Sequence, residues 1–177
     1  MTQASHSPRW RIDALETSSF TLDGGAMFGV VPRELWKHEL APDERNGVRM
    51  SMRALLLRGF DGRQDRRMLI DCGMGDGYDA RWLDRFAVEP CALGLFGGLR
   101  ALGCPPESIT DLICTHLHFD HCGGLVTPSP LGALNGDPTS PAPLASALTC
   151  SFPNARHHVQ ATQLAHALAP NAKDRSS

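Results

Sequence analysis

Residues Thr115-His116-Leu117-His118-Phe119-Asp120-His121-Cys122-Gly123-Gly124 decide how this chain is interpreted. Three histidines and one aspartate lie within six residues of this stretch. Imidazole nitrogens and carboxylate oxygens are ligands that Zn²⁺ accepts in proteins. Side chains two positions apart in an extended segment point the same way, so His116 and His118 can bind one metal together. A bend after His118 would turn the next two ligands toward a second metal, and the glycine pair would let the backbone approach closely.

The segments around this motif predict a mixed α and β domain. Residues 109–115 form an apolar, β-branched run, which predicts a short buried strand that would give the ligands a stiff base. Residues 50–58 and 67–70 predict two strands joined by a turn at Asp61-Gly62, as in a hairpin. Residues 20–32 predict a strand, a Gly-rich turn and a second short strand. Helices are predicted over 79–88, 93–102 and 162–169. A Pro/Ala-rich loop over 127–149 precedes a last predicted strand over 152–160.

Length and composition predict one globular domain. The chain has 177 residues, of which 42% are hydrophobic and 20% charged. A formal net charge of -2 gives no electrostatic reason to expect a nucleic-acid partner. No apolar run approaches the roughly 20 residues that span a membrane, and the first ten residues lack the apolar core of a secretory signal. We therefore expect a cytoplasmic protein that acts on a small-molecule substrate.

Six cysteines are spread along the chain, and no two of them form a Cys-x-x-Cys pair. This spacing indicates neither a zinc knuckle nor a thioredoxin-like motif, so free thiols are expected in a reducing compartment. Cys114 and Cys122 flank the histidine cluster. Because a free cysteine is often a small buried residue, we expect both to pack and not to bind metal.

The histidine stretch resembles the His-x-His-x-Asp-His signature of the metallo-β-lactamase superfamily. This resemblance implies a fold of the α/β (α+β) class, an αββα sandwich. It also implies that His116 and His118 bind a first metal, that Asp120 and His121 bind a second, and that Asp120 orients the attacking water. Residues 69–73 resemble the family's Asp-x-Gly motif, which implies that Asp71 supports the metal ligands; a turn-forming aspartate before glycine is the alternative. Residues 22–32 and 152–156 resemble the lactonase and organophosphate-hydrolase-like branch.

Further ligands that the family uses come later in its sequences: a third histidine for the first metal, a bridging aspartate and a last histidine. After His121 this chain has two acidic residues and three histidines, which are Asp137, Asp174, His157, His158 and His166. His157 and His158 are adjacent on a predicted strand and face opposite ways, so at most one of them points inward, and His166 is expected at a solvated helix position. We therefore do not expect these three histidines to replace the missing ligands. We expect one partial domain over 1–177, truncated to about the first half, with weakened metal binding and an uncovered sheet that favours self-association.

Three functions remain open at this point. The resemblance implies a zinc-dependent hydrolase, in which metal-bound hydroxide attacks a lactone, an ester or a related substrate. Two zinc ions are expected in the complete fold, with iron as the alternative metal. The chain could instead be a non-catalytic fragment that binds metal weakly, or a mononuclear iron thiol-oxidising enzyme of the same fold. The diiron branch is disfavoured because glutamate commonly replaces the second histidine of the signature there, and this chain has His118.

Overall fold

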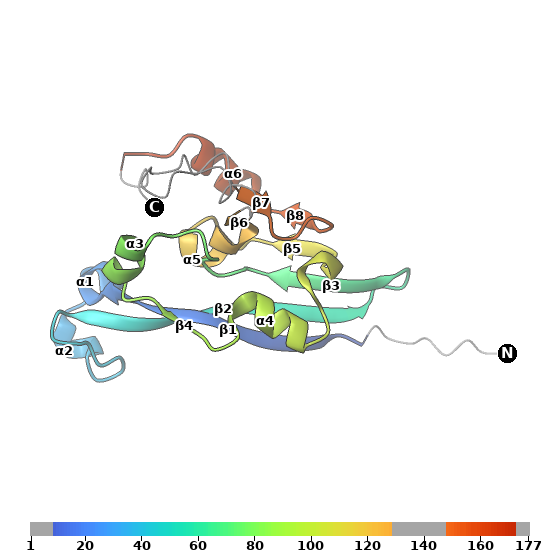
Figure 1. The fold of residues 1–177 in the computed structure, drawn as a ribbon. Coiled ribbons are helices and arrows are strands. Elements are labelled where there is room, and N and C mark those ends of the chain that lie inside the picture. The colour runs from blue at the N-terminus through green and yellow to red at the C-terminus, as the bar shows by residue number, and fades with distance from the viewer. Residues whose placement is uncertain (1–8, 129–147, 173–177) are drawn as a thin grey trace, which may run out of the picture.

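A computed structural model describes residues 9–128 and 148–172 of the chain. Its main feature is a six-stranded mixed sheet, in which the strands follow the order β4-β1-β2-β3-β5-β8 (Figure 1). The strands β1 to β4 pair antiparallel, whereas β5 and β8 extend the sheet in parallel beside β3. Their bounds are Arg11–Asp23 for β1, Gly47–Phe60 for β2, Asp65–Ile70 for β3, Glu89–Pro90 for β4, Asp111–Ile113 for β5 and Arg156–His158 for β8.

The hairpin between β2 and β3 confirms the predicted turn at Asp61-Gly62. The Asp61 carboxylate accepts hydrogen bonds from the backbone N–H groups of Arg63 and Gln64 at 2.8 and 2.9 Å, which closes the turn. Short polar side chains favour turns by this type of local bond. β2 is longer than the predicted strand because it also pairs with β1 along nearly its whole length.

Three predicted helices are present, as α3 (Ala80–Arg85), α4 (Gly94–Ala101) and α6 (Ala161–Leu168). The Asp79 side chain caps α3 by accepting a hydrogen bond from Trp82 N at 2.7 Å. α4 packs against β1 through the buried side chains of Leu95 and Leu99. Gly98 has a packing role, because a Cβ there would lie 3.0 Å from Leu15 Cδ2. This explains why a residue with low helix propensity is present inside the helix.

The second short strand predicted within residues 20–32 was wrong. β1 ends at Asp23, and the chain continues as two short helices, α1 (Gly24–Phe28) and α2 (Arg33–Trp36). The Asp23 carboxylate accepts a hydrogen bond from Ala26 N at 3.0 Å and so caps α1. The rings of Phe28 and Trp36 stack at 4.4 Å and hold the two short helices together. The glycines therefore begin a helix here and do not form a turn between strands.

The strand predicted over 152–160 is shorter in the structure. Only Arg156–His158 pairs in the sheet, because residues 152–155 form a turn in which Ala155 N donates to Phe152 O at 3.1 Å. Phe152 is fully buried and packs against Phe96 of α4. The ends of the predicted 127–149 loop also differ, because β6 (Val126–Pro128) and β7 (Leu148–Cys150) pair as a small second sheet. The rest of that loop lies outside the described residues.

Two clusters of buried side chains form the core, both on the helix-covered side of the sheet. The larger is built around α4 and the strands, and contains Leu15, Leu56, Leu69, Leu99, Leu112 and Phe152. The smaller contains Phe20, Met52 and Met74, with partly buried aromatic side chains packed around them. Phe119 of the histidine motif packs against this smaller cluster, which therefore supports the site.

The other face of the main sheet carries apolar side chains that are exposed among the described residues. Ile12 is 63% and Leu55 39% exposed. The β1–β2 register pairs these two positions with Leu57 and Ala14, which makes one continuous apolar surface. Self-association through this surface stays a prediction. In the described ranges, no helix has the length and apolar character needed to cross a membrane.

Candidate metal centre

The histidine motif begins directly after β5, at the end of the sheet where β3 also ends. Its first residues are extended, and the short helix α5 (Phe119–Cys122) begins immediately after His118. The backbone N–H groups of His121 and Cys122 both donate to His118 O at 3.0 Å. The predicted bend after His118 is therefore present, and the helical turn brings the later part of the motif back toward the earlier part.

Three imidazole rings of the motif lie side by side. The ring centroid of His116 is 4.7 Å from that of His118 and 4.0 Å from that of His121. Burial lowers the pKa of His116, and the neighbouring imidazoles lower it further. The neutral ring, which has a free nitrogen lone pair, is the form that binds a metal.

The carboxylate of Asp120 lies next to this group. Its Oδ2 is 3.3 Å from His121 Nε2. Two ligands at about 2.1 Å from one tetrahedral cation would be about 3.4 Å apart, so this separation fits two ligands of a common ion. A set of imidazole nitrogens and carboxylate oxygens is also the chemistry that zinc prefers. The donor types and this spacing therefore fit a bound divalent metal.

Asp71 connects the end of β3 to the motif. The residue is buried and has a left-handed backbone with φ of 57°. Its carboxylate accepts hydrogen bonds from the N–H of Thr115 and from the Thr115 hydroxyl, each at 2.8 Å. His121 Nδ1 lies 2.8 Å from the same carboxylate. Because a carboxylate accepts, Nδ1 carries the proton, which leaves the Nε2 lone pair of His121 free for a metal.

Backbone contacts fix α5 against the segment that follows β3. Cys72 N donates to His121 O at 2.8 Å, and Gly124 N donates to Gly73 O at 2.9 Å. A Cβ on Gly123 would lie 2.3 Å from Met74 O, which no real side chain tolerates without a backbone shift. The predicted close approach of the glycine pair is thus confirmed, and it has a structural cause.

Phe119 anchors the centre of the motif in the smaller core cluster. Its ring packs against four aromatic rings with centroid distances between 4.6 and 6.3 Å, those of Phe20, Tyr78, Trp82 and Phe86. Sequence reasoning did not identify this cluster or the role of Thr115. The sequence signal that could have identified it was the aromatic residue Phe119 between the candidate ligands His118 and Asp120. A buried side chain at that position fixes the ligands on both sides of it.

A groove of about 820 Å³ lies beside the motif. His118, Asp120 and His121 form one wall. The remaining walls are largely apolar and include Leu22, Met27, Met50, Trp82 and Phe86, with Arg85 as the one cation. A groove lined by both polar ligand-type side chains and apolar side chains suits a substrate with a reactive polar bond and an apolar body.

The later histidines do not join this group in the structure. His158 Nε2 lies 3.0 Å from Asp111 Oδ1, and His157 Nε2 lies 3.8 Å from Cys150 Sγ. Whether either residue completes the site stays a prediction. Across residues 9–128 and 148–172, no group of three or more His, Cys, Asp or Glu side chains is arranged so that it could hold a metal ion.

Cys114 and Cys122 pack in the larger core cluster, as predicted. Burial raises the pKa of Cys114 to about 11 and also raises that of Cys122. Both thiols therefore stay neutral near pH 7 in this structure and act as small apolar groups.

The fold thus places a cluster of histidine and aspartate side chains at the strand ends of a mixed sheet. Residues 54–127 match the family model of the metallo-beta-lactamase superfamily. This range runs from the middle of β2 through the whole motif. The chain thus has the metallo-β-lactamase fold, an α+β fold, as the resemblance implied.

Solved structures support the same fold. A probable metal-dependent hydrolase from Staphylococcus aureus is 28% identical, with a TM-score of 0.76 over 95% of this chain and 53% of that one. The hydrolase AbOPH, of the beta lactamase superfamily, is 24% identical, with a TM-score of 0.59 over 96% and 47%. The dizinc quorum-quenching lactonase AidC is 19% identical, with a TM-score of 0.62 over 93% and 46%. None of the curated proteins compared matches. The chain spans about half the length of these structures.

Proposed function

We propose that this protein is a metal-dependent hydrolase whose metal ligands include His116, His118, Asp120 and His121. The observation that carries the proposal is the hydrogen bond between His121 Nδ1 and Asp71 at 2.8 Å, within a group of three adjacent imidazoles. A carboxylate that fixes the tautomer of a histidine is the usual support of a metal ligand. The similarity to metal-dependent hydrolases of this fold supports the same assignment.

Each residue near the motif has a distinct role in this proposal. Asp71 is a positioning residue, because it holds the His121 ring and also fixes the start of the motif through Thr115. Asp120 would orient the attacking water and accept its proton. A bound zinc ion would make that water acidic and would polarise the bond to be cleaved.

Zinc is the proposed metal, with two ions in the complete fold. The nitrogen and oxygen donors of the motif suit zinc, and the similar lactonase AidC is described as a dizinc enzyme. Iron is the alternative. Elemental analysis of the protein purified from its native host separates the two, since iron as the dominant metal would favour the thiol-oxidising alternative.

A lactone or an ester is the proposed substrate. The groove beside the motif offers apolar surface from Met27, Met50 and Trp82 for the body of such a molecule. The reactive carbonyl would then lie against the polar wall that contains Asp120. The lactonase AidC, solved with a lactone-derived product, has the same fold.

The test is hydrolysis of an aryl ester and of a simple lactone by the zinc-loaded chain. We expect turnover that is lost in His116→Ala and retained in His158→Ala, whose imidazole contacts Asp111 and not the motif. Equal rates for wild type and His116→Ala would contradict the proposal. Zinc binding without turnover would favour the alternative function, a non-catalytic protein that binds metal weakly.

A further inference from the structure

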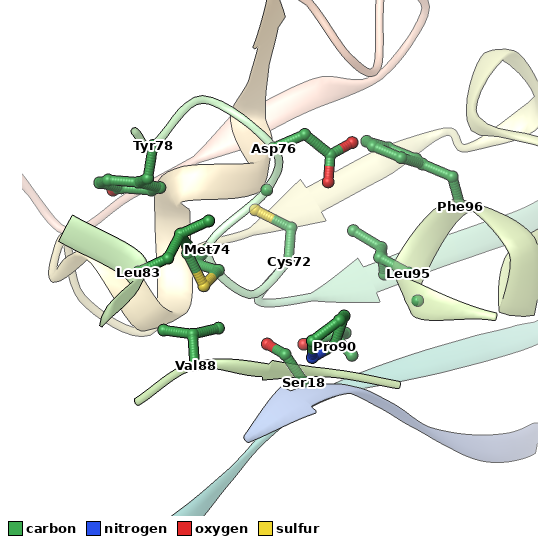
Figure 2. Close-up of a pocket in the computed structure, with 13 residues that line it drawn as sticks. Ser18, Cys72, Met74, Asp76, Tyr78, Leu83, Val88, Pro90, Leu95 and Phe96 are labelled. Atoms are coloured by element: carbon green, nitrogen blue, oxygen red, sulfur yellow. The ribbon is translucent and has the colours of Figure 1, made fainter. Parts of the chain in front are cut away.

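A separate cavity of about 310 Å³ lies on the other side of the segment that follows β3. It is partly open to solvent and is lined by residues of the 72–78 segment, of α4 and of β4 (Figure 2). Most of its wall is apolar and consists of Met74, Leu83, Val88, Pro90, Leu95 and Phe96. The volume is at the lower end of the range found for small-molecule sites, about 300–1,000 Å³. The cavity therefore suits a compact ligand with an apolar body.

Asp76 is the one charged residue that lines this cavity. Figure 2 shows its carboxylate directed across the space toward the ring of Phe96, above the Cys72 thiol. In the part of the chain that the structure describes, no lysine or arginine pairs with it. The Asp76 residue is exposed, so its carboxylate contributes a negative charge that is accessible both from the cavity and from solvent.

The other polar groups of the wall are neutral. Burial raises the pKa of the Cys72 thiol far above its usual range and that of Tyr78 to about 12, so both groups stay protonated. The Ser18 hydroxyl already donates to Met52 Sδ at 3.1 Å. A ligand that enters the cavity therefore meets one carboxylate and otherwise apolar or neutral groups.

We propose that this cavity binds a small apolar cation, such as a protonated amine on an aromatic or aliphatic body. The apolar wall would bury the body of the ligand, and the ammonium group would pair with Asp76. Tyr78 and Phe96 also line the cavity, and an aromatic ring close to the ammonium group would add a cation–π contact. An anionic ligand of the same size would be repelled by the carboxylate.

The site is distinct from the groove at the histidine motif, although Tyr78 lines both. Tyr78 stacks on Trp82 with ring centroids 4.1 Å apart. A ligand in the cavity would contact Tyr78 and so change the environment of Trp82. Tryptophan fluorescence is therefore a direct report of binding, in addition to calorimetry.

The test uses the full chain, with benzylamine as the probe and benzyl alcohol as its neutral analogue. We expect saturable benzylamine binding at millimolar concentration or below, and binding of the alcohol that is weaker by at least about tenfold. Asp76→Asn should weaken benzylamine binding to the level of the alcohol. Asp84→Asn removes the same charge from nearby α3 without touching the cavity, and it should bind as wild type does.

Two further variants keep the result interpretable. Val88→Phe should fill part of the cavity and reduce binding of both probes, with a thermal melt to show that the variant is folded. His116→Ala should bind benzylamine as wild type does, which shows that the amine does not coordinate a metal at the motif. No saturable binding to wild type, or equal binding by wild type and Asp76→Asn, would overturn the proposal whatever the outcome of the hydrolysis assay.

Discussion

The two ends of strand β3 hold carboxylates in opposite ways. At its beginning, the Arg66 guanidinium forms ion pairs with both Asp61, at 2.7 Å, and Asp111, at 3.0 Å. At its end, Asp71 accepts hydrogen bonds only from the neutral groups of Thr115 and from the imidazole of His121. No lysine or arginine within the described ranges forms an ion pair with the motif carboxylates.

This difference separates a structural end of the sheet from the end at which we propose the metal site. An arginine stays charged at all relevant pH values, so a cation that approached the beginning of β3 would meet the positive charge of Arg66 and would have to displace its ion pairs. Carboxylates held by neutral donors keep their negative charge, and imidazoles can give up their protons to a metal. The end of β3 is therefore suited to a divalent ion, and the following predictions test this contrast.

The largest effect is expected for His118→Ala. Loss of one imidazole should lower zinc affinity by more than about 100-fold, because few side chains of this chain hold the ion. Calorimetric zinc titration, or competition with a coloured chelator, measures this change. His158→Ala is the matched control, because its imidazole contacts Asp111 and not the motif, and it should bind zinc as wild type does. Unchanged affinity in His118→Ala would show that the motif is not the metal site.

Asp71→Asn should have the second largest effect. The amide no longer favours a proton on His121 Nδ1, so zinc affinity should fall by about 10–100-fold. A purely structural role would lower stability and leave the ring tautomer unchanged. Nitrogen chemical shifts of the His121 ring distinguish these cases, since the proton should redistribute toward Nε2 in the variant. A variant with wild-type tautomer and affinity would refute the positioning role.

Gly123→Ala tests the close contact between α5 and the segment after β3. The new Cβ would lie 2.3 Å from Met74 O, and relief of this clash should destabilise the fold by about 1–3 kcal/mol. Gly77→Ala is the matched control, because a Cβ there meets no atom within 4 Å and its φ is not positive. Urea unfolding midpoints measure both. Equal midpoints for the two variants would mean that α5 can move away from the Met74 backbone without loss of stability.

The hairpin, three helices and the bend of the motif could be predicted because their signals are local. The motif combines a buried run, four candidate ligands of two types and a glycine pair in adjacent positions. The helix α1 was missed because the capping side chain of Asp23 outweighs the turn-forming tendency of the two glycines that follow. A capping signal of this kind was present in the sequence and could have been weighed.

The partners of Asp71 could not be predicted by the same reasoning. Thr115 and His121 are 44 and 50 residues away in the sequence, and they reach Asp71 only because β3 and β5 are parallel neighbours. A turn-forming aspartate and a supporting aspartate look identical in the sequence. In the structure, Asp71 has a left-handed backbone, and its carboxylate accepts hydrogen bonds from Thr115.

The smallest effect is expected for Asp61→Asn, at the beginning of β3, where Asp61 pairs with Arg66. The Arg66 guanidinium, helped by the N–H groups of Gln64 and Arg63, lowers the pKa of Asp61 to about 2. The unfolded value is about 3.9, so the stabilisation is fully present above that pH and is lost as the pH falls through about 2.

Asp61→Asn should therefore unfold at a slightly lower urea concentration than wild type at neutral pH. The difference should vanish as the pH falls to about 2. Zinc affinity should not change. Asp65→Asn removes a nearby carboxylate that forms no ion pair among the described residues, and its midpoint should follow wild type at every pH. A difference between Asp61→Asn and wild type that persisted in acid would contradict a role for the Asp61 charge. It would show instead that Asp61 acts through its turn hydrogen bonds and that asparagine does not replace them.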